Sequence, residues 1–177
     1  MLKVNGNLLY IQKKYLVDKL GEDRLREFLE KASSETKEVY SGAILSSKWY
    51  PQKYYEEILE LMEARFGIGE IDKYSAWIAE KQLVGFYGMV AKFLSINRIT
   101  TLAQKYWDKL YDEGKVTVLE NEKDHIKAQI EDIILSDLYV YSLMMYLKRW
   151  VELSQKTDVK AHWKRMHESG FTIEFNF

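Results

Sequence analysis

The chain has 177 residues, enough for one domain with a substantial hydrophobic core. Hydrophobic residues make up 47% and charged residues 30%, and 26 basic against 27 acidic residues leave a net charge of −1. This composition excludes a disordered chain and provides no overall field that would attract nucleic acid or an acidic membrane surface. Because the chain has no cysteine, a disulfide framework, a thiolate metal site and a cysteine nucleophile are also excluded.

The N-terminal residues MLKVNGNLLYIQKKYL lack the apolar core and the small-residue cleavage site of a signal peptide. No apolar run reaches the roughly 18 residues of a membrane-spanning helix. We therefore expect a cytoplasmic protein with no membrane span and no nucleic-acid partner. The single proline, the 13 tyrosines and the many Lys and Glu residues predict a thermophilic host.

Apolar residues recur with the period of a helix through the first two thirds of the chain. Asn5–Asn7 is expected to cap the first helix and Gly21 to end it, while Ser33 or Ser34 caps a later one. Pro51 fits the first turn of another helix, where its missing N–H is not needed. The predicted helices cover residues 8–20, 23–31, 35–40, 52–66 and 71–94, with a last one ending at Tyr111.

The predicted helix over 71–94 is apolar on more than one face, which is typical of a helix at the centre of a domain. Gly85 and Gly88 each cost this helix about 1 kcal/mol relative to alanine. We expect the close approach of another helix, or of a ligand, to compensate for that cost.

The last third of the chain changes to the period of a β-strand. One predicted hairpin includes residues 116–130, a second ends in the alternating segment Phe171–Phe177, and a helix over 137–155 separates them. Such a hairpin–helix–hairpin unit forms an antiparallel sheet with one face covered. The sequence therefore predicts an α+β fold in which N-terminal helices pack with a four-stranded antiparallel sheet. We expect a single domain with a helical part at 1–112 and a sheet part at 115–177.

Several segments resemble motifs of a bacterial domain family of unknown function that is abundant in myxobacteria. Ser41–Pro51 is similar to its "gil-pssWYP" segment, 84–94 to "l-Gvyr-llrlgs" and 101–118 to "rlw-ryyd-Gel-v". Residues 150–177 are similar to its ending, a helix followed by a strand–Gly–strand hairpin. That family resembles a wider group of 4-vinyl reductase-type domains, heme nitric-oxide-binding domains and subunits of a Golgi vesicle-tethering complex.

The resemblance to this group implies helices beside a four-stranded sheet, homodimers through the helices, and an interior pocket that holds heme or a fatty-acyl chain in some members. Two departures change the expected ligand. Relatives often carry metal-binding cysteines in the last hairpin, and this chain has none, so we expect no metal. Heme-binding relatives need a helical histidine and a Tyr-x-Ser-x-Arg motif, whereas this chain has Phe93, Ser95 and Arg98 with one residue too many between the last two. Because the three histidines are predicted to lie in strands or turns and not on a helix, we expect no heme and no other cofactor.

The sequence contains no recognisable catalytic constellation. His162 and His167 are five residues apart, which places them on opposite faces of a continuous strand, and His125 is predicted to be a solvated turn residue. There is no G-x-S-x-G, P-loop or dinucleotide-binding motif. We therefore predict that the chain is not an enzyme. A reductase, hydrolase or isomerase is the alternative that a strongly shifted carboxylate or histidine inside a cleft would support.

Aromatic residues and glycines near the polar joint at 95–101 form the candidate site. Aromatic residues at helical spacing usually form core packing, but apolar ligand pockets have the same kind of wall with a few polar groups. Tyrosine hydroxyls and Arg98 would supply those polar groups here. The predicted pocket residues are Trp49, Tyr50, Gly85, Phe86, Tyr87, Gly88, Phe93, Arg98, Tyr106, Trp107 and Tyr111.

Two functions fit this site. The first is a non-enzymatic module that binds a small apolar molecule or an acyl chain and acts as a sensor, which a cavity of a few hundred Å³ at these residues would favour. The second is a homodimeric assembly or scaffold subunit without a ligand, whose helices would expose an apolar patch of several hundred Å².

Overall fold

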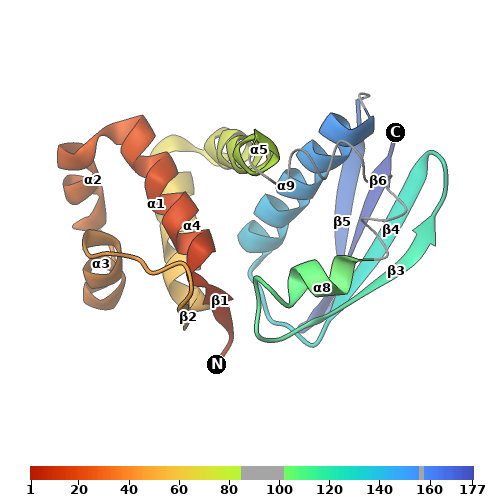
Figure 1. The fold of residues 1–177 in the computed structure, drawn as a ribbon, viewed down its shortest axis with the longest axis horizontal. Coiled ribbons are helices and arrows are strands. Elements are labelled where there is room, and N and C mark those ends of the chain that lie inside the picture. Colours follow the sequence, from red (N-terminus) through yellow and green to blue (C-terminus); the bar gives the residue numbers. More distant parts are fainter. Residues whose placement is uncertain (85–101, 156–157) are drawn as a thin grey trace. The chain divides into compact units, whose positions relative to one another are not determined.

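The structure is a computed structural model, and it describes residues 1–84, 102–155 and 158–177 (Figure 1). The chain divides into two compact units. Unit 1 comprises Met1–Ile71 and Lys109–Asp112, and unit 2 comprises Asp72–Asp108 and Glu113–Phe177. Our expectation of a single domain stays a prediction.

Unit 1 is built from helices and a short antiparallel ribbon. Val4 pairs with Tyr50 across the ribbon and also forms an isolated antiparallel bridge with Tyr111. The ribbon was not predicted, because strands of three residues are too short for alternation to be recognised. The helices are α1 (Gly6–Leu20), α2 (Glu22–Leu29), α3 (Ser34–Ser41) and α4 (Gln52–Phe66), and the strands are β1 (Lys3–Asn5) and β2 (Trp49–Pro51).

The ends of these helices follow the sequence signals. The Asn5 side chain accepts a hydrogen bond from the N–H of Asn7 at 2.9 Å, which caps α1. Ser33 caps α3. Gly21 and Gly67 follow α1 and α4 with φ of 77° and 81°, a left-handed conformation that residues with a Cβ rarely adopt.

Unit 2 contains the four-stranded antiparallel sheet, whose strand order is β3-β4-β6-β5. Helix α9 connects the two hairpins and lies against the sheet (Figure 1). This arrangement confirms the predicted α+β fold. The strands are β3 (Lys115–Asn121), β4 (His125–Glu131), β5 (Lys160–His167) and β6 (Gly170–Asn176), and the helices are α8 (Ala103–Trp107) and α9 (Asp137–Gln155).

Helix α5 (Ile68–Val84) is the described part of the predicted central helix, whose remainder lies outside the described residues. Its residues from Asp72 onward belong to unit 2. Side-chain contacts hold this part of α5 along α9. They join Tyr141 Oη to Asp72 Oδ1 at 2.7 Å, Ser75 Oγ to the backbone oxygen of Ser142 at 3.1 Å, and Arg149 Nη2 to Glu80 Oε1 at 2.6 Å.

The sheet has one apolar face and one polar face. The apolar face carries buried side chains of the two central strands, namely Ile126, Ile130, Phe171, Ile173 and Phe175. The residues that alternate with the apolar ones on β4 and β6 make up the opposite face and are polar or charged, namely Lys127, Gln129, Thr172 and Glu174. This is the alternation expected of a sheet that is covered on one side.

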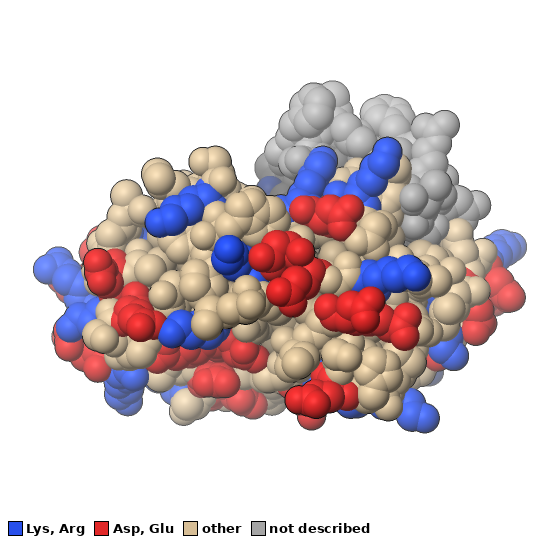
Figure 2. All heavy atoms as spheres, turned by 90° about the horizontal axis from the view of Figure 1, so that it is seen from below, with Lys and Arg blue, Asp and Glu red and all other residues tan. Residues whose placement is uncertain are grey.

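Within the described ranges, no helix is both long and apolar enough to cross a membrane. Acidic and basic side chains are interspersed on the face of the molecule that Figure 2 shows. This mixture agrees with the net charge of −1.

Candidate functional site

Three of the predicted pocket residues lie in unit 1, around Val4. Tyr50 and Tyr111 are 7% and 5% exposed and both pair with Val4. The ring of Tyr50 lies against Gly6, where an added Cβ would come within 2.8 Å of it. Trp49 pairs with Asn5 and is 37% exposed. The two tyrosines are therefore packed in the core of unit 1, whereas Trp49 faces solvent.

Two others, Tyr106 and Trp107, lie on α8 in unit 2. The indole Nε1 of Trp107 donates to the backbone oxygen of Glu113 at 2.8 Å. Its ring covers Gly114, which has a φ of 101° and where a Cβ would lie only 2.7 Å from Nε1. Gln104 accepts a hydrogen bond from the N–H of Val116 at 2.6 Å. Trp107 and Gln104 thus fix the turn that leads from α8 into β3.

The remaining predicted pocket residues lie outside the described residues. They are Gly85, Phe86, Tyr87, Gly88, Phe93 and Arg98. The pocket itself stays a prediction.

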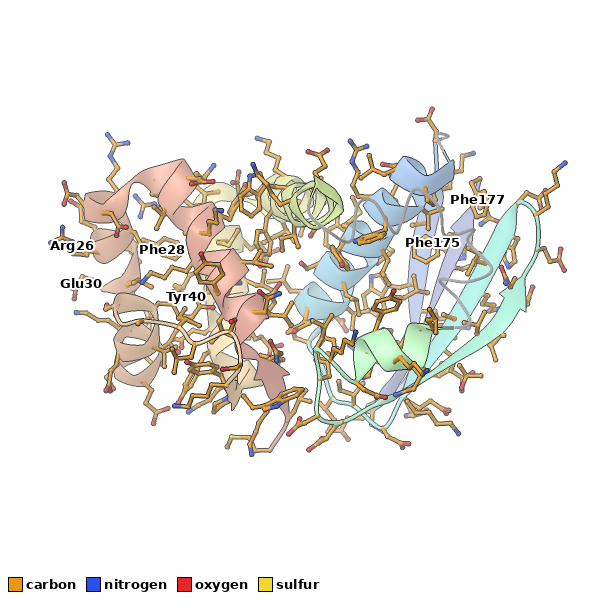
Figure 3. All side chains as sticks on the ribbon, viewed as in Figure 1. Arg26, Phe28, Glu30, Tyr40, Phe175 and Phe177 are labelled. Atoms are coloured by element: carbon orange, nitrogen blue, oxygen red, sulfur yellow. The ribbon has the colours of Figure 1, made fainter. Side chains whose placement is uncertain are left out.

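Buried polar groups in unit 1 are bonded to one another. Figure 3 shows Phe28 and Tyr40 between the helices, with Arg26 and Glu30 directed outward. The hydroxyl of the fully buried Tyr40 donates to Oε1 of Gln12, which is also fully buried. Nε2 of Gln12 donates in turn to a backbone oxygen of α4 at 3.2 Å.

Glu70 is a second buried polar group of unit 1, and it is 4% exposed. It accepts a hydrogen bond from the Tyr15 hydroxyl at 2.5 Å and lies 2.7 Å from Nζ of Lys19. Burial and the hydrogen bond to Glu70 raise the pKa of Tyr15 far above its ordinary value. The phenol therefore stays protonated and acts as a donor, which is a structural role.

Unit 2 differs, because two of its buried N–H groups have no hydrogen-bond partner among the described residues. One is Nε1 of Trp150 on α9, whose ring forms an edge contact with Tyr146 at 6.4 Å between centroids. The other is Nη1 of Arg165 on β5. A buried donor without a partner costs roughly 1–3 kcal/mol, so an acceptor supplied by a ligand would be favoured at either place.

Arg165 lies on the apolar face of the sheet because it pairs with Phe171. Its guanidinium carbon is 5.6 Å from the centre of the Trp163 ring and 5.9 Å from that of Phe171. Nη2 donates to the backbone oxygen of Leu135 at 2.9 Å and to Oδ1 of Asp137 at 2.5 Å. Sequence reasoning missed this residue, although extending the inward alternation of Trp163 by two positions reaches it.

The three histidines were predicted to lie in strands or turns, and the structure places them on β4 and β5. Each has a carboxylate within 4 Å. The prediction that His125 lies in the turn is wrong, because it belongs to a strand. It is the first residue of β4, its side chain is 18% exposed, and its Nδ1 is 2.9 Å from Asn176 Oδ1. In the part of the chain that the structure describes, no group of three or more His, Asp or Glu residues is arranged to hold a metal ion.

No protein-family model and no curated protein matches the chain. Solved structures of H-NOX domains, which bind heme and nitric oxide or oxygen, share its fold. A mutant of the Fe(II) unliganded H-NOX protein from K. algicida is 12% identical with a TM-score of 0.72, and the match covers 97% of this chain and 95% of that one. An oxygen-binding H-NOX domain related to soluble guanylate cyclases is 12% identical with a TM-score of 0.67, covering 98% and 94%.

A mutant H-NOX from T. Tengcongensis is 14% identical with a TM-score of 0.64, and the match covers 98% of this chain and 97% of that one. At these identities the similarity shows the fold alone. The chain therefore has an H-NOX-like fold over nearly its whole length, which confirms that part of the predicted resemblance.

The residues of this chain do not fit a heme held by histidine or cysteine. Heme iron is held in proteins by His, Cys, Met or Tyr side chains. The chain has no cysteine, and its only three histidines are strand residues that face carboxylates. The segment 85–101 contains no histidine either. No helical histidine is available for the role that the resemblance assigns to one.

Proposed function

We propose that this chain is a non-enzymatic module that binds a small molecule and acts as a sensor. The observation that carries the proposal is the fold that it shares with H-NOX domains over 97% of its length. Those neighbours are described as heme or oxygen-binding proteins, and the likeness makes ligand binding the function that this fold supports best. The strongly raised pKa values of Tyr15 and Tyr40 belong to phenols that donate structural hydrogen bonds, which gives enzymatic chemistry no support.

The proposed ligand is an apolar small molecule or an acyl chain with one hydrogen-bond acceptor. Because no helical histidine is available to hold heme, we infer that the ligand is an apolar molecule that needs no iron ligand. The proposed walls are the predicted pocket residues Tyr106 and Trp107 on α8, together with those between Gly85 and Arg98, which lie outside the described residues. The buried N–H of Trp150 would supply a polar anchor, because it has no partner among the described residues.

Binding of palmitate to the purified full-length chain tests this proposal. Tryptophan fluorescence and native mass spectrometry should show one bound molecule. The variant Trp150→Phe, which keeps an aromatic ring but removes the N–H, should weaken binding about tenfold, the value of one hydrogen bond to a charged group. Trp163→Phe is the matched control on the sheet and should bind palmitate nearly as wild type does. If neither palmitate nor hexadecanol binds, and solvent extraction yields no ligand, the apolar-ligand proposal fails.

Titration with hemin distinguishes heme binding from the binding of an apolar small molecule. We expect no heme complex whose visible absorption spectrum depends on histidine. The triple variant His125→Gln, His162→Gln, His167→Gln should therefore give the same hemin spectrum as wild type. A heme absorption band that wild type shows and the triple variant loses would contradict the assignment.

Finer parts of the function are also proposals. The motifs at 41–51 and 101–118 support membership of the bacterial family of unknown function. A homodimer through the helices rests on the same resemblance, and light scattering that finds only monomer at high concentration would remove it.

A further inference from the structure

His125 reaches strands on both sides of β4 at the end of the sheet. Its Nδ1 lies 2.9 Å from Oδ1 of Asn176 on β6, and its Nε2 lies 3.2 Å from Oε2 of Glu120 on β3. Both ring nitrogens therefore face hydrogen-bond acceptors. A protonated imidazole donates from both nitrogens, whereas the neutral ring has only one N–H. The two contacts are satisfied together only when the ring is charged.

We propose that His125, Glu120 and Asn176 form a proton-dependent clamp, which joins the ends of β3, β4 and β6 in acid and releases one contact when the ring loses its proton. This His125 clamp is independent of any ligand. It would make the end of the sheet a pH-responsive element of the fold.

The His125 clamp lies beside the tip of the β3–β4 hairpin. The N–H of Glu122 donates to the backbone oxygen of His125 at 2.7 Å, and the N–H of Phe177 donates to that of Asp124 at 3.0 Å. These two backbone hydrogen bonds close the hairpin tip and fix the C-terminal end of the chain beside it. Their protection from exchange therefore reports whether the clamp is closed.

Charged groups of both signs lie around the His125 ring, and their net effect favours its protonated form. Lys127 on β4 lies 3.8 Å from both Glu120 and Glu174, so it offsets part of their negative charge. On β5, His162 is 3.2 Å from Glu174, and Lys160 pairs with Asn176. The carboxylates that act on the ring come from three places, Glu120 on β3, Glu122 in the turn and Glu174 on β6.

The direction of the pH dependence follows from these contacts. The hydrogen bond with Asn176 and the neighbouring carboxylates raise the pKa of His125 above 6.5, although burial works against them. A group whose pKa is raised on folding stabilises the fold fully below its unfolded value. The His125 clamp is therefore closed below pH 6.5 and is lost as the pH rises through the raised pKa.

Amide hydrogen exchange at Glu122 and Phe177 in the full chain tests the clamp. Protection factors, corrected for intrinsic exchange, should fall on the order of tenfold between about pH 5.5 and pH 8. In His125→Gln they should be low at both pH values. Glu120→Gln keeps an acceptor oxygen without the charge and should reduce the pH dependence. His167→Gln is the matched control, because His167 pairs with Gly170 at the opposite end of β5, and it should behave as wild type.

One competing geometry gives a distinct result. If the Asn176 amide is turned so that its nitrogen donates to Nδ1, the neutral ring satisfies both neighbours and protection does not depend on pH. Equal protection factors at the two pH values in wild type would overturn the proposal. A pH dependence that survives in His125→Gln would overturn it as well.

Discussion

The two units differ in whether their buried polar groups have hydrogen-bond partners among the described residues. In unit 1, Gln12 and Glu70 are both bonded to side chains of other helices. Tyr40 donates to Gln12, and Tyr15 and Lys19 contact Glu70. In unit 2, the N–H groups of Trp150 Nε1 and Arg165 Nη1 are buried without a partner among the described residues. Buried donors in native proteins nearly always have partners, so each exception calls for an explanation.

This difference bears on the proposed ligand binding. A region whose polar groups are all bonded gains nothing from an added acceptor, whereas a region with an unpaired donor does. On our proposal, a ligand would therefore bind in unit 2, whereas the bonded polar groups of unit 1 have a structural role. Two of the predicted pocket residues, Tyr50 and Tyr111, are core residues of unit 1.

The largest expected effect comes from the core of unit 2. Phe171 is fully buried on the central strand β6, and replacing it with alanine should cost about 3–5 kcal/mol of unfolding free energy. Phe177→Ala, at the half-buried end of the chain, is the matched control and should cost much less. Denaturant titration measures both values. Equal losses would mean that the apolar face of the sheet is not the core that holds unit 2 together.

Hydrogen exchange on Phe171→Ala also tests whether the chain is one cooperative domain. If it is, amides of unit 1 such as those of α1 should lose protection together with amides of the sheet. Unchanged protection in unit 1 would show that the two units unfold separately.

Sequence patterns predicted those parts of the fold in which burial repeats regularly. The alternation of Phe171, Ile173 and Phe175 identified β6, and Gly21 identified the end of α1. The β1–β2 ribbon was missed because its strands are short and lie far apart in the sequence. The pairing of β4 with β6 across α9 is also nonlocal, and no residue pattern specifies it.

The site was harder to predict, because its signals come from pairs that are distant in sequence. His125 was assigned to solvent from its position after Asp124, yet its contacts are Glu120 on β3 and Asn176 on β6. An unpaired donor such as Trp150 Nε1 cannot be recognised in a sequence at all, since an indole at helical spacing has the same pattern with or without a partner. Aromatic composition identified candidate residues but not their neighbours.

A smaller effect is expected when a bonded polar pair of unit 1 is broken. Tyr40→Phe removes the hydroxyl that donates to Gln12 and leaves a fully buried amide oxygen without that donor. The unfolding free energy should fall by about 1–3 kcal/mol. Tyr10→Phe is the matched control, because Tyr10 is 48% exposed and should change stability by less than about 0.5 kcal/mol. If the two variants are equally stable by denaturant titration, the buried network does not support unit 1 as we infer.

The smallest expected effect is a difference between the two units in how their stability depends on pH. In unit 1, Glu57 on α4 accepts hydrogen bonds from the backbone N–H of Ser33 at 2.5 Å and from the hydroxyls of Ser33 and Thr36 at the start of α3. Burial raises the pKa of Glu57, but these hydrogen bonds outweigh it and hold the pKa below 4.5. The stabilisation is therefore present above pH 4.5 and is lost as the pH falls through the lowered pKa.

Glu57→Gln should accordingly cost up to about 1 kcal/mol at pH 7, because it weakens a helix cap that solvent partly screens. Its melting temperature should approach that of wild type in acid. Glu60 on the same helix is the matched control with the opposite sign: burial and its acidic neighbours raise its pKa, so Glu60→Gln should stabilise the chain at pH 7. The Glu57 contribution in unit 1 is lost in acid, whereas the His125 contribution in unit 2 is lost in base. Melting curves of Glu57→Gln and His125→Gln that converge on wild type at the same end of the pH range would contradict this difference between the units.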